Sequence, residues 1–92
     1  MYDYSRLPAH MQDPIRRYVE TGASVGGFLK AMLSNNLVQS FAIADEINRA
    51  SMFQWADFLY NEVPRDCWGS PEAIARWQGH KGLSELRRNS TY

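Results

Sequence analysis

The stretch between Asn36 and Pro64 places the tightest limit on how this chain can fold. No Gly or Pro occurs over 37–62, and apolar side chains recur at the three- and four-residue spacing of one helix face. They are Leu37, Phe41, Ala44, Met52, Trp55 and Leu59, widened by Val38, Ile43, Ile47 and Phe58. Pro64 ends the segment, because it disfavours helical geometry at the residue before it. The pattern predicts a long third helix over about 37–62.

One straight helix of this length does not fit a domain of 92 residues. It would be about 39 Å long, whereas a compact chain of this size has a diameter of roughly 32 Å. Either the helix bends or breaks near 45–50, or its overhang packs against another copy or a partner. Because no Gly or Pro forces a break there, the sequence favours an oligomer or partner interface. Three apolar residues are the interface candidates: Met52, Trp55 and Phe58.

Two helices are expected before this segment. Asp13 and Pro14 form a start signal for a helix over 14–21, and Gly22 suits the left-handed position that ends it. Ser24 is expected to cap the next helix. Its apolar face follows the helical template at Val25, Phe28, Leu29, Met32 and Leu33. Asn36, with Gln39 three residues later, resembles a capping box at the start of the long segment.

The C-terminal third begins with a loop and continues as a helix. Ser70 and Pro71 supply a cap and a proline at the first helical position, and Gly79 is expected to close the helix. A last turn at Leu83 and Leu86 precedes a polar tail, 89–92. No strand-like alternation is present, so we predict an all-α fold. It is a compact bundle of four to five helices in a single domain, 1–92, with an N-terminal arm over 1–12.

Charge and composition narrow the function classes. Ten basic and ten acidic residues cancel, which disfavours a partner recognised through its phosphate backbone. No apolar run approaches the ~20 residues that span a bilayer, and the first ten residues, MYDYSRLPAH, lack the regions of a signal peptide. Cys67 is the single cysteine and cannot form an internal disulfide. We therefore expect a cytoplasmic protein without a membrane segment.

The loop Gly22-Ala23-Ser24-Val25-Gly26-Gly27 resembles a phosphate-binding loop only in its glycine spacing. Phe28 and Leu29 occupy the positions of the Lys and the Ser or Thr that such a loop requires. The loop also follows a predicted helix instead of a strand. Helix capping accounts for Gly22 and Ser24. Gly26 and Gly27 leave open a close approach by another backbone or a ligand.

The segment Trp68-Gly69-Ser70-Pro71 is the stronger candidate for a ligand site. Free N–H groups at a helix start attract anions, and an exposed Trp can stack on a planar group. Glu72 opposes this reading, and a plain capped helix anchored by Trp68 is the alternative. The candidate ligand-binding residues are Tyr60, Arg65, Trp68, Ser70, Arg76, Trp77 and Lys81, with His80 adding positive charge nearby.

Metal and catalytic signals are weak. His10, His80 and Cys67 are isolated in sequence, which is not the spacing of a metal site, and we expect no cofactor. Folding can bring Cys67 and His80 together as a nucleophile and base, but one such pair is a minority reading, and we expect no enzyme. Four carboxylates are expected on the solvated face of the long segment: Asp45, Glu46, Asp57 and Glu62. Asp45 and Arg49 have the spacing of a helix-surface ion pair.

Several strings in the chain resemble a known family. They include Leu7-Pro8-Ala9-His10-Met11 and Leu33-Ser34-Asn35-Asn36-Leu37, then Phe58-Leu59-Tyr60-Asn61-Glu62 and Cys67-Trp68-Gly69-Ser70-Pro71-Glu72. On these residues the chain, from about Leu7 to Leu83, resembles an uncharacterised family of short proteins encoded by tailed bacteriophages and prophages. The family has a proline or serine in the loop before Phe28, where this chain has Val25-Gly26-Gly27.

The resemblance implies a phage accessory protein that acts in the cytoplasm of a host bacterium. Such a protein commonly binds and neutralises a host component. We therefore expect an inhibitor of antiviral defence, which either sequesters a nucleotide signal or masks a host defence protein. The alternative is a small nucleic-acid-binding regulator, with a helix-turn-helix over 14–33. That alternative is disfavoured because Lys30 is the only charge on its recognition helix.

Overall fold

The computed structural model describes residues 2–83. Within this range the chain forms six α-helices and one 3-10 turn, and no strand is present. The helices are α1 (Ala9–Thr21), α2 (Gly27–Leu33), α3 (Leu37–Ile43), α4 (Glu46–Ala50), α5 (Met52–Asn61) and α6 (Pro71–Gly79). The 3-10 turn η1 (Arg65–Cys67) lies in the expected loop between α5 and α6. The all-α prediction is confirmed, but the predicted long helix is divided and the helices are more numerous than predicted.

The predicted long helix over 37–62 is wrong, because the segment breaks twice. Ala44 is extended (φ −68°, ψ 138°), and the Asp45 carboxylate accepts a hydrogen bond at 2.7 Å from the Asn48 backbone N–H. Asp45 thus caps a new helix without any Gly or Pro. A second break at Ser51 separates α4 from α5. The geometric argument for an overhanging helix, and for an oligomer built on it, therefore no longer applies.

The predicted helix over 14–21 begins five residues earlier, at Ala9, and Pro14 lies inside it. Asp13 is therefore not its cap. Its carboxylate lies 2.6 Å from the guanidinium of Arg17. The 1–12 segment is not a detached arm, because Tyr4 and Leu7 are buried in the core. Helix α1 begins directly after Pro8, which is its N-cap residue.

The predicted start of the second helix was also too early. Ser24 makes no cap, and α2 begins at Gly27 after Gly26. Other signals were read correctly: Asn36 accepts a hydrogen bond from the Gln39 N–H, and Gly22 ends α1 with φ 72°.

The start signal of α6 was also read correctly, because the Ser70 hydroxyl accepts from the Ala73 N–H. Gly79 is the last residue of α6, but the left-handed positions come later, at Lys81 and Gly82. Leu83 packs against the core. Leu86 and the 89–92 tail lie outside the described residues.

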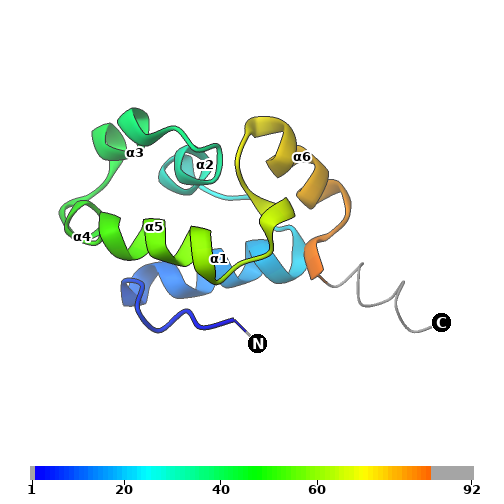
Figure 1. Ribbon diagram of the computed structural model, residues 1–92, viewed down its shortest axis with the longest axis horizontal. Helices are drawn as coiled ribbons and strands as arrows, with labels where there is room; N and C mark the ends of the chain where they lie inside the picture. Colours follow the sequence, from blue (N-terminus) through cyan, green and yellow to red (C-terminus); the bar gives the residue numbers. More distant parts are fainter. Residues whose placement is uncertain (1, 84–92) are drawn as a thin grey trace.

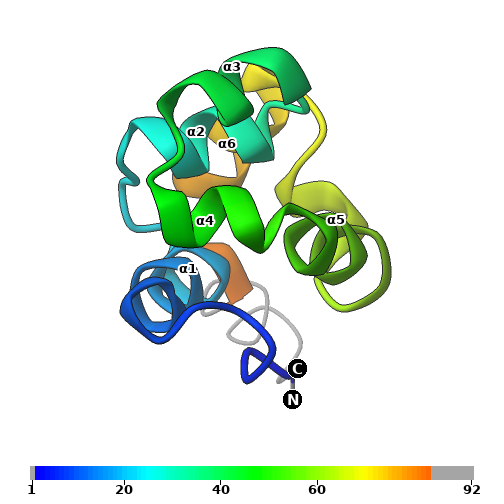
Figure 2. The same ribbon diagram turned by 90° about the vertical axis from the view of Figure 1, so that its left-hand side faces the viewer.

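Two layers enclose the core (Figures 1 and 2). Helices α1 and α5 run side by side, α2 and α6 lie over them, and α3 packs on the outside of α2. The larger core side chains come from α1, α2, α5 and α6: Ile15, Tyr18, Val19, Leu29, Leu33, Trp55, Phe58, Leu59, Ile74 and Trp77. Among the described residues, α3 and α4 supply no side chain to this hydrophobic cluster. No helix within 2–83 is long and apolar enough to cross a membrane.

A close backbone approach joins Gly22, after α1, to Gly82, after α6. Gly82 has φ 62°, and an added Cβ there would lie 2.7 Å from the Gly22 nitrogen and from the Val19 oxygen. Gly82→Ala is therefore expected to destabilise the protein by about 1–3 kcal/mol, measured by urea unfolding. Gly79→Ala is the control, because its added Cβ meets nothing within 4 Å. It should instead stabilise the protein by about 0.5–1 kcal/mol. Equal effects of the two substitutions would contradict this close approach.

Candidate functional site

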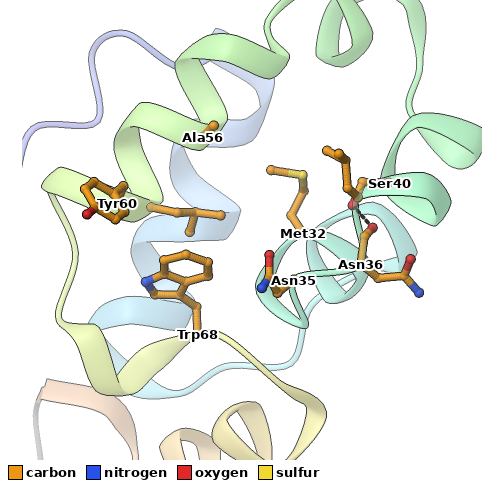
Figure 3. A pocket seen from close by; sticks show the side chains of 9 residues that line it. Met32, Asn35, Asn36, Ser40, Ala56, Tyr60 and Trp68 are labelled. Atoms are coloured by element: carbon orange, nitrogen blue, oxygen red, sulfur yellow. Dashed lines mark hydrogen bonds between the residues drawn. The ribbon is translucent and has the colours of Figure 1, made fainter.

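A groove of about 300 Å³ lies between α5 and the corner that joins α2 to α3. We call it the apolar groove, and it is lined by Met32, Asn35, Asn36, Leu37, Ser40, Ala56, Leu59, Tyr60 and Trp68. Ala56 and Tyr60 of α5 stand on one side, and Asn36 and Ser40 stand on the other, with Met32 and Trp68 between them (Figure 3). Five segments of the fold therefore contribute to one site: α2, the α2–α3 corner, α3, α5 and the loop after η1.

The α2–α3 corner is fixed by backbone hydrogen bonds. Asn35 adopts the left-handed conformation (φ 63°), its N–H donates to the Met32 oxygen, and the Asn36 N–H donates to the Ala31 oxygen. This is the Schellman ending of a helix, in which Asn is a frequent substitute for Gly. Asn36 then caps α3, and its carbonyl oxygen accepts from the Ser40 hydroxyl at 2.6 Å (Figure 3). The polar groups on this side are thus largely engaged within the corner.

Trp68 is held in place by its neighbours in the loop. It is extended and half-buried, and the N–H of the next residue, Gly69, donates to the Leu33 oxygen at 2.7 Å. This bond ties the loop to the end of α2. On the opposite side, Tyr60 is 81% exposed at the rim. The groove therefore has one fixed aromatic wall and one aromatic side chain that is free to rearrange.

Among residues 2–83, no charged side chain lines the apolar groove. Its surface consists of aliphatic, thioether and aromatic side chains with a few amide and hydroxyl groups at the corner. Such a site favours an apolar group, because a buried charge without a partner pays a large desolvation penalty. The site is therefore suited to an apolar side chain or a short helix face, and not to a phosphate.

The predicted ligand-binding residues separate into two groups. Tyr60 and Trp68 line the apolar groove, and together with Arg65 they also line an adjoining hollow of about 320 Å³. These three are brought together as the sequence suggested. Sequence reasoning missed Met32, Asn35 and Ala56, whose roles depend on tertiary contacts and carry no local motif.

The other predicted ligand residues lie elsewhere or have structural roles. The Ser70 hydroxyl is used to cap α6. Arg76 and Trp77 line a separate hollow of about 290 Å³ with Asp66 and His80. Lys81 is exposed, in the left-handed turn after α6.

Trp77 itself is a core residue. Its indole N–H donates to the Tyr18 and Val19 oxygens at 3.1 and 3.2 Å. The Asp66 carboxylate would oppose an anion in the hollow beside it. The ligand-binding residues predicted from the sequence therefore do not come together as one phosphate site.

The three predicted interface residues belong to the core. Trp55, Phe58 and Met52 are all buried, and the Trp55 indole donates to the side-chain oxygen of Asn48 at 3.1 Å. All three lie on the side of α5 that faces the core. As folded, this chain does not offer them to a partner, so placing them at an interface was wrong.

The apolar side chains at the start of the same segment are exposed instead. We call α3 and α4 together the α3–α4 end, which faces the viewer in Figure 2. Its inward residues on α3 and just after it are small: Ser40 and Ala44. Its large apolar side chains are between 41% and 79% exposed: Leu37, Val38, Phe41, Ile43 and Ile47. Periodicity placed these residues on one continuous apolar face with Met52, Trp55 and Leu59, whereas the structure exposes the five and buries those three.

The four carboxylates of the predicted solvated face behave differently from one another. Asp45 caps α4 and lies 3.1 Å from His10, and these contacts, chiefly the Asn48 N–H, hold its pKa below the usual value. Arg49, its expected partner, donates to the Ala44 oxygen instead. Asp57 is half-buried and pairs with Arg6 at 2.9 Å, whereas Glu46 is exposed and Glu62 half-buried. The expected Asp45–Arg49 pair is thus replaced by a cap.

Two other sequence hypotheses meet structural obstacles. Helix α2, the expected recognition helix, is covered by α3 and α6 and buries Leu29, Met32 and Leu33. Within this helix, Gly27 and Lys30 are the exposed residues, so little of its surface could enter a nucleic-acid groove. In the glycine-rich loop, an added Cβ at Gly26 would meet nothing within 4 Å, and one at Gly27 would meet only Ile43 at 3.5 Å.

Within residues 2–83, no cluster of three or more His, Cys, Asp or Glu side chains could hold a metal ion.

No family model, curated protein or solved structure matches the chain. The site must therefore be interpreted from its own geometry and chemistry.

Cys67 is expected to be inert in the folded protein. Its side chain is fully buried, and burial raises the pKa of the thiol to about 12. Because the thiolate is the reactive form, Ellman's reagent at neutral pH should label Cys67 only after unfolding in guanidinium. Labelling of the folded protein at the rate of a free thiol would contradict this and would revive the pairing of Cys67 with His80.

Proposed function

We propose that this chain is a non-enzymatic phage accessory protein that masks a host defence protein in the cytoplasm of the bacterium. The apolar groove is its binding site, and the observation that carries the proposal is that the described residues lining that groove are all uncharged. The resemblance to phage-encoded proteins supports the biological setting. The target would insert an apolar side chain or helix face between Tyr60 and Ala56 on one side and Leu37 on the other.

The chemistry of the site favours a protein target over a nucleotide signal. Tyr60 and Trp68 could stack on a base, but among the described residues that line the groove and the adjoining hollow, Arg65 is the one positive charge. Arg76 lies in the other hollow, next to Asp66. A nucleotide phosphate would therefore meet one exposed cation, whereas an apolar protein segment would bury most of the groove surface.

A thermal-shift experiment separates the two kinds of target. A nucleotide that is bound at one hundred times its dissociation constant stabilises the folded state by about 2.7 kcal/mol. In a domain of this size that stabilisation would raise the Tm by roughly 10 °C or more. With a panel of cyclic and ADP-ribose-type nucleotides, we expect no such rise. A rise with any member of the panel would favour the nucleotide-sequestering function instead.

The proposed site can be tested by charge insertion. Tyr60→Glu and Ala56→Glu each place a charge on an exposed rim position of the groove. A buried, unpaired charge opposes binding, so each variant should lose at least about tenfold in affinity for a masked protein. The measurement is the plating efficiency of phage on bacterial strains that each carry one defence system and express the chain.

The matched control is Ala75→Glu, at an exposed position of α6 outside the groove. It should restore plating as well as the parent chain does, and circular dichroism should show that all three variants are folded. Full activity of Tyr60→Glu and Ala56→Glu would exclude the groove as the site. Failure of the parent chain to restore plating in any strain would contradict the proposed function itself.

A further inference from the structure

The α3–α4 end is a second apolar surface, separate from most of the groove. It is unusual because its helices contribute nothing to the hydrophobic cluster and yet carry five large exposed apolar side chains. Single exposed apolar residues are ordinary, but a group of this size is typical of an interaction surface. We propose that this end pairs with the same end of a second copy, so that the chain forms a two-fold symmetric dimer.

The area available fits a dimer. If a fully exposed aliphatic side chain presents ~150 Å², the lower end of the range for aromatic side chains, the exposed fractions of the five side chains amount to on the order of 450 Å² per copy. Two copies would then bury roughly 900 Å², the size of a weak, reversible interface. The polar residues around the five side chains would add to this area.

The charges of the α3–α4 end also fit a second copy. Helix α3 carries no ionisable residue, so two copies can approach along it without like charges meeting. Helix α4 carries one acid, Glu46, and one base, Arg49, both exposed. A two-fold axis brings residue i of one copy to residue j of the other and the reverse. Glu46 of each copy can therefore face Arg49 of its partner, and the net charge of zero removes long-range repulsion.

The exposed side of α3 allows close packing against the same helix of a second copy. Val38 and Ala42 both lie on the side of α3 opposite the buried Ser40, and Val38 is 79% exposed. The short Ala42 side chain lets a second helix approach. Leu37 also lines the groove, so the groove adjoins the dimer interface, whereas Tyr60 and Trp68 lie outside that interface. Each dimer would present two grooves.

The test is the mass of the protein in solution, measured by sedimentation equilibrium over a wide concentration range. The parent chain should reach twice its 10.6 kDa mass. Val38→Glu and Ile47→Glu should each weaken dimerisation at least about tenfold, because each would bury an unpaired charge. Both positions are exposed, 79% and 58%, so the monomer should fold as before by circular dichroism.

Tyr60→Glu is the matched control, since it inserts the same charge at a position 81% exposed but on the groove. It should remain dimeric. A parent chain that is monomeric at every concentration would overturn the proposal, and so would a dimer that withstands both Val38→Glu and Ile47→Glu. The result is independent of the proposed function, because masking is tested by plating and dimerisation is tested on the purified chain.

Discussion

The C-terminal end of α1 holds together parts of the chain that are distant in sequence. The Tyr18 hydroxyl donates to the Cys67 oxygen at 2.7 Å, and the Trp77 indole donates to the Tyr18 and Val19 oxygens, across 49 to 59 residues. The last carbonyls of a helix lack partners within it, and a buried Tyr or Trp needs a partner for its polar atom. The hydroxyl and indole donors and the backbone carbonyls thus satisfy one another's hydrogen bonding in a site from which water is excluded. The bonds fix α1, η1 and α6 relative to one another.

The shape of the groove depends on these hydrogen bonds at the C-terminal end of α1. Trp68 follows Cys67 directly, so the hydrogen bond from Tyr18 to the Cys67 oxygen sets where the loop leaves η1. The bond from Gly69 to the Leu33 oxygen sets where it meets α2. Leu59 completes the wall from the core-facing side of α5. Because core contacts place these residues, the groove is formed before any partner arrives, and binding need not include the cost of ordering a loop.

Sequence patterns predicted the parts of this fold that depend on neighbouring residues. Ser70 and Pro71 start α6, Gly22 ends α1 and Asn36 starts α3 because each acts within a few positions of itself. A break near 45–50 was one of two alternatives and the less favoured one, since the cap at Asp45 lies inside an apolar segment and has no strong signal.

Periodicity also could not separate an apolar face that joins the core from one that stays exposed. It placed Trp55 and Phe41 on the same apolar face, but Trp55 is buried in the core and Phe41 is exposed. Of the site, Tyr60, Arg65 and Trp68 were found from their chemistry. The residues opposite them, such as Met32 and Asn35, depend on how α2 ends and were not predictable locally.

The uncharged lining of the groove also determines how the groove would recognise a partner. Without a field to steer approach, association proceeds at the ordinary rate of ~10⁵–10⁶ M⁻¹s⁻¹, so affinity must come from slow dissociation. Slow dissociation requires close fit, which a fixed wall such as Trp68 supplies and a mobile rim residue such as Tyr60 can adjust. The α3–α4 end lacks a fixed wall but is independent of the core cluster. Substitutions among its side chains can therefore change pairing without lowering the stability of the folded chain.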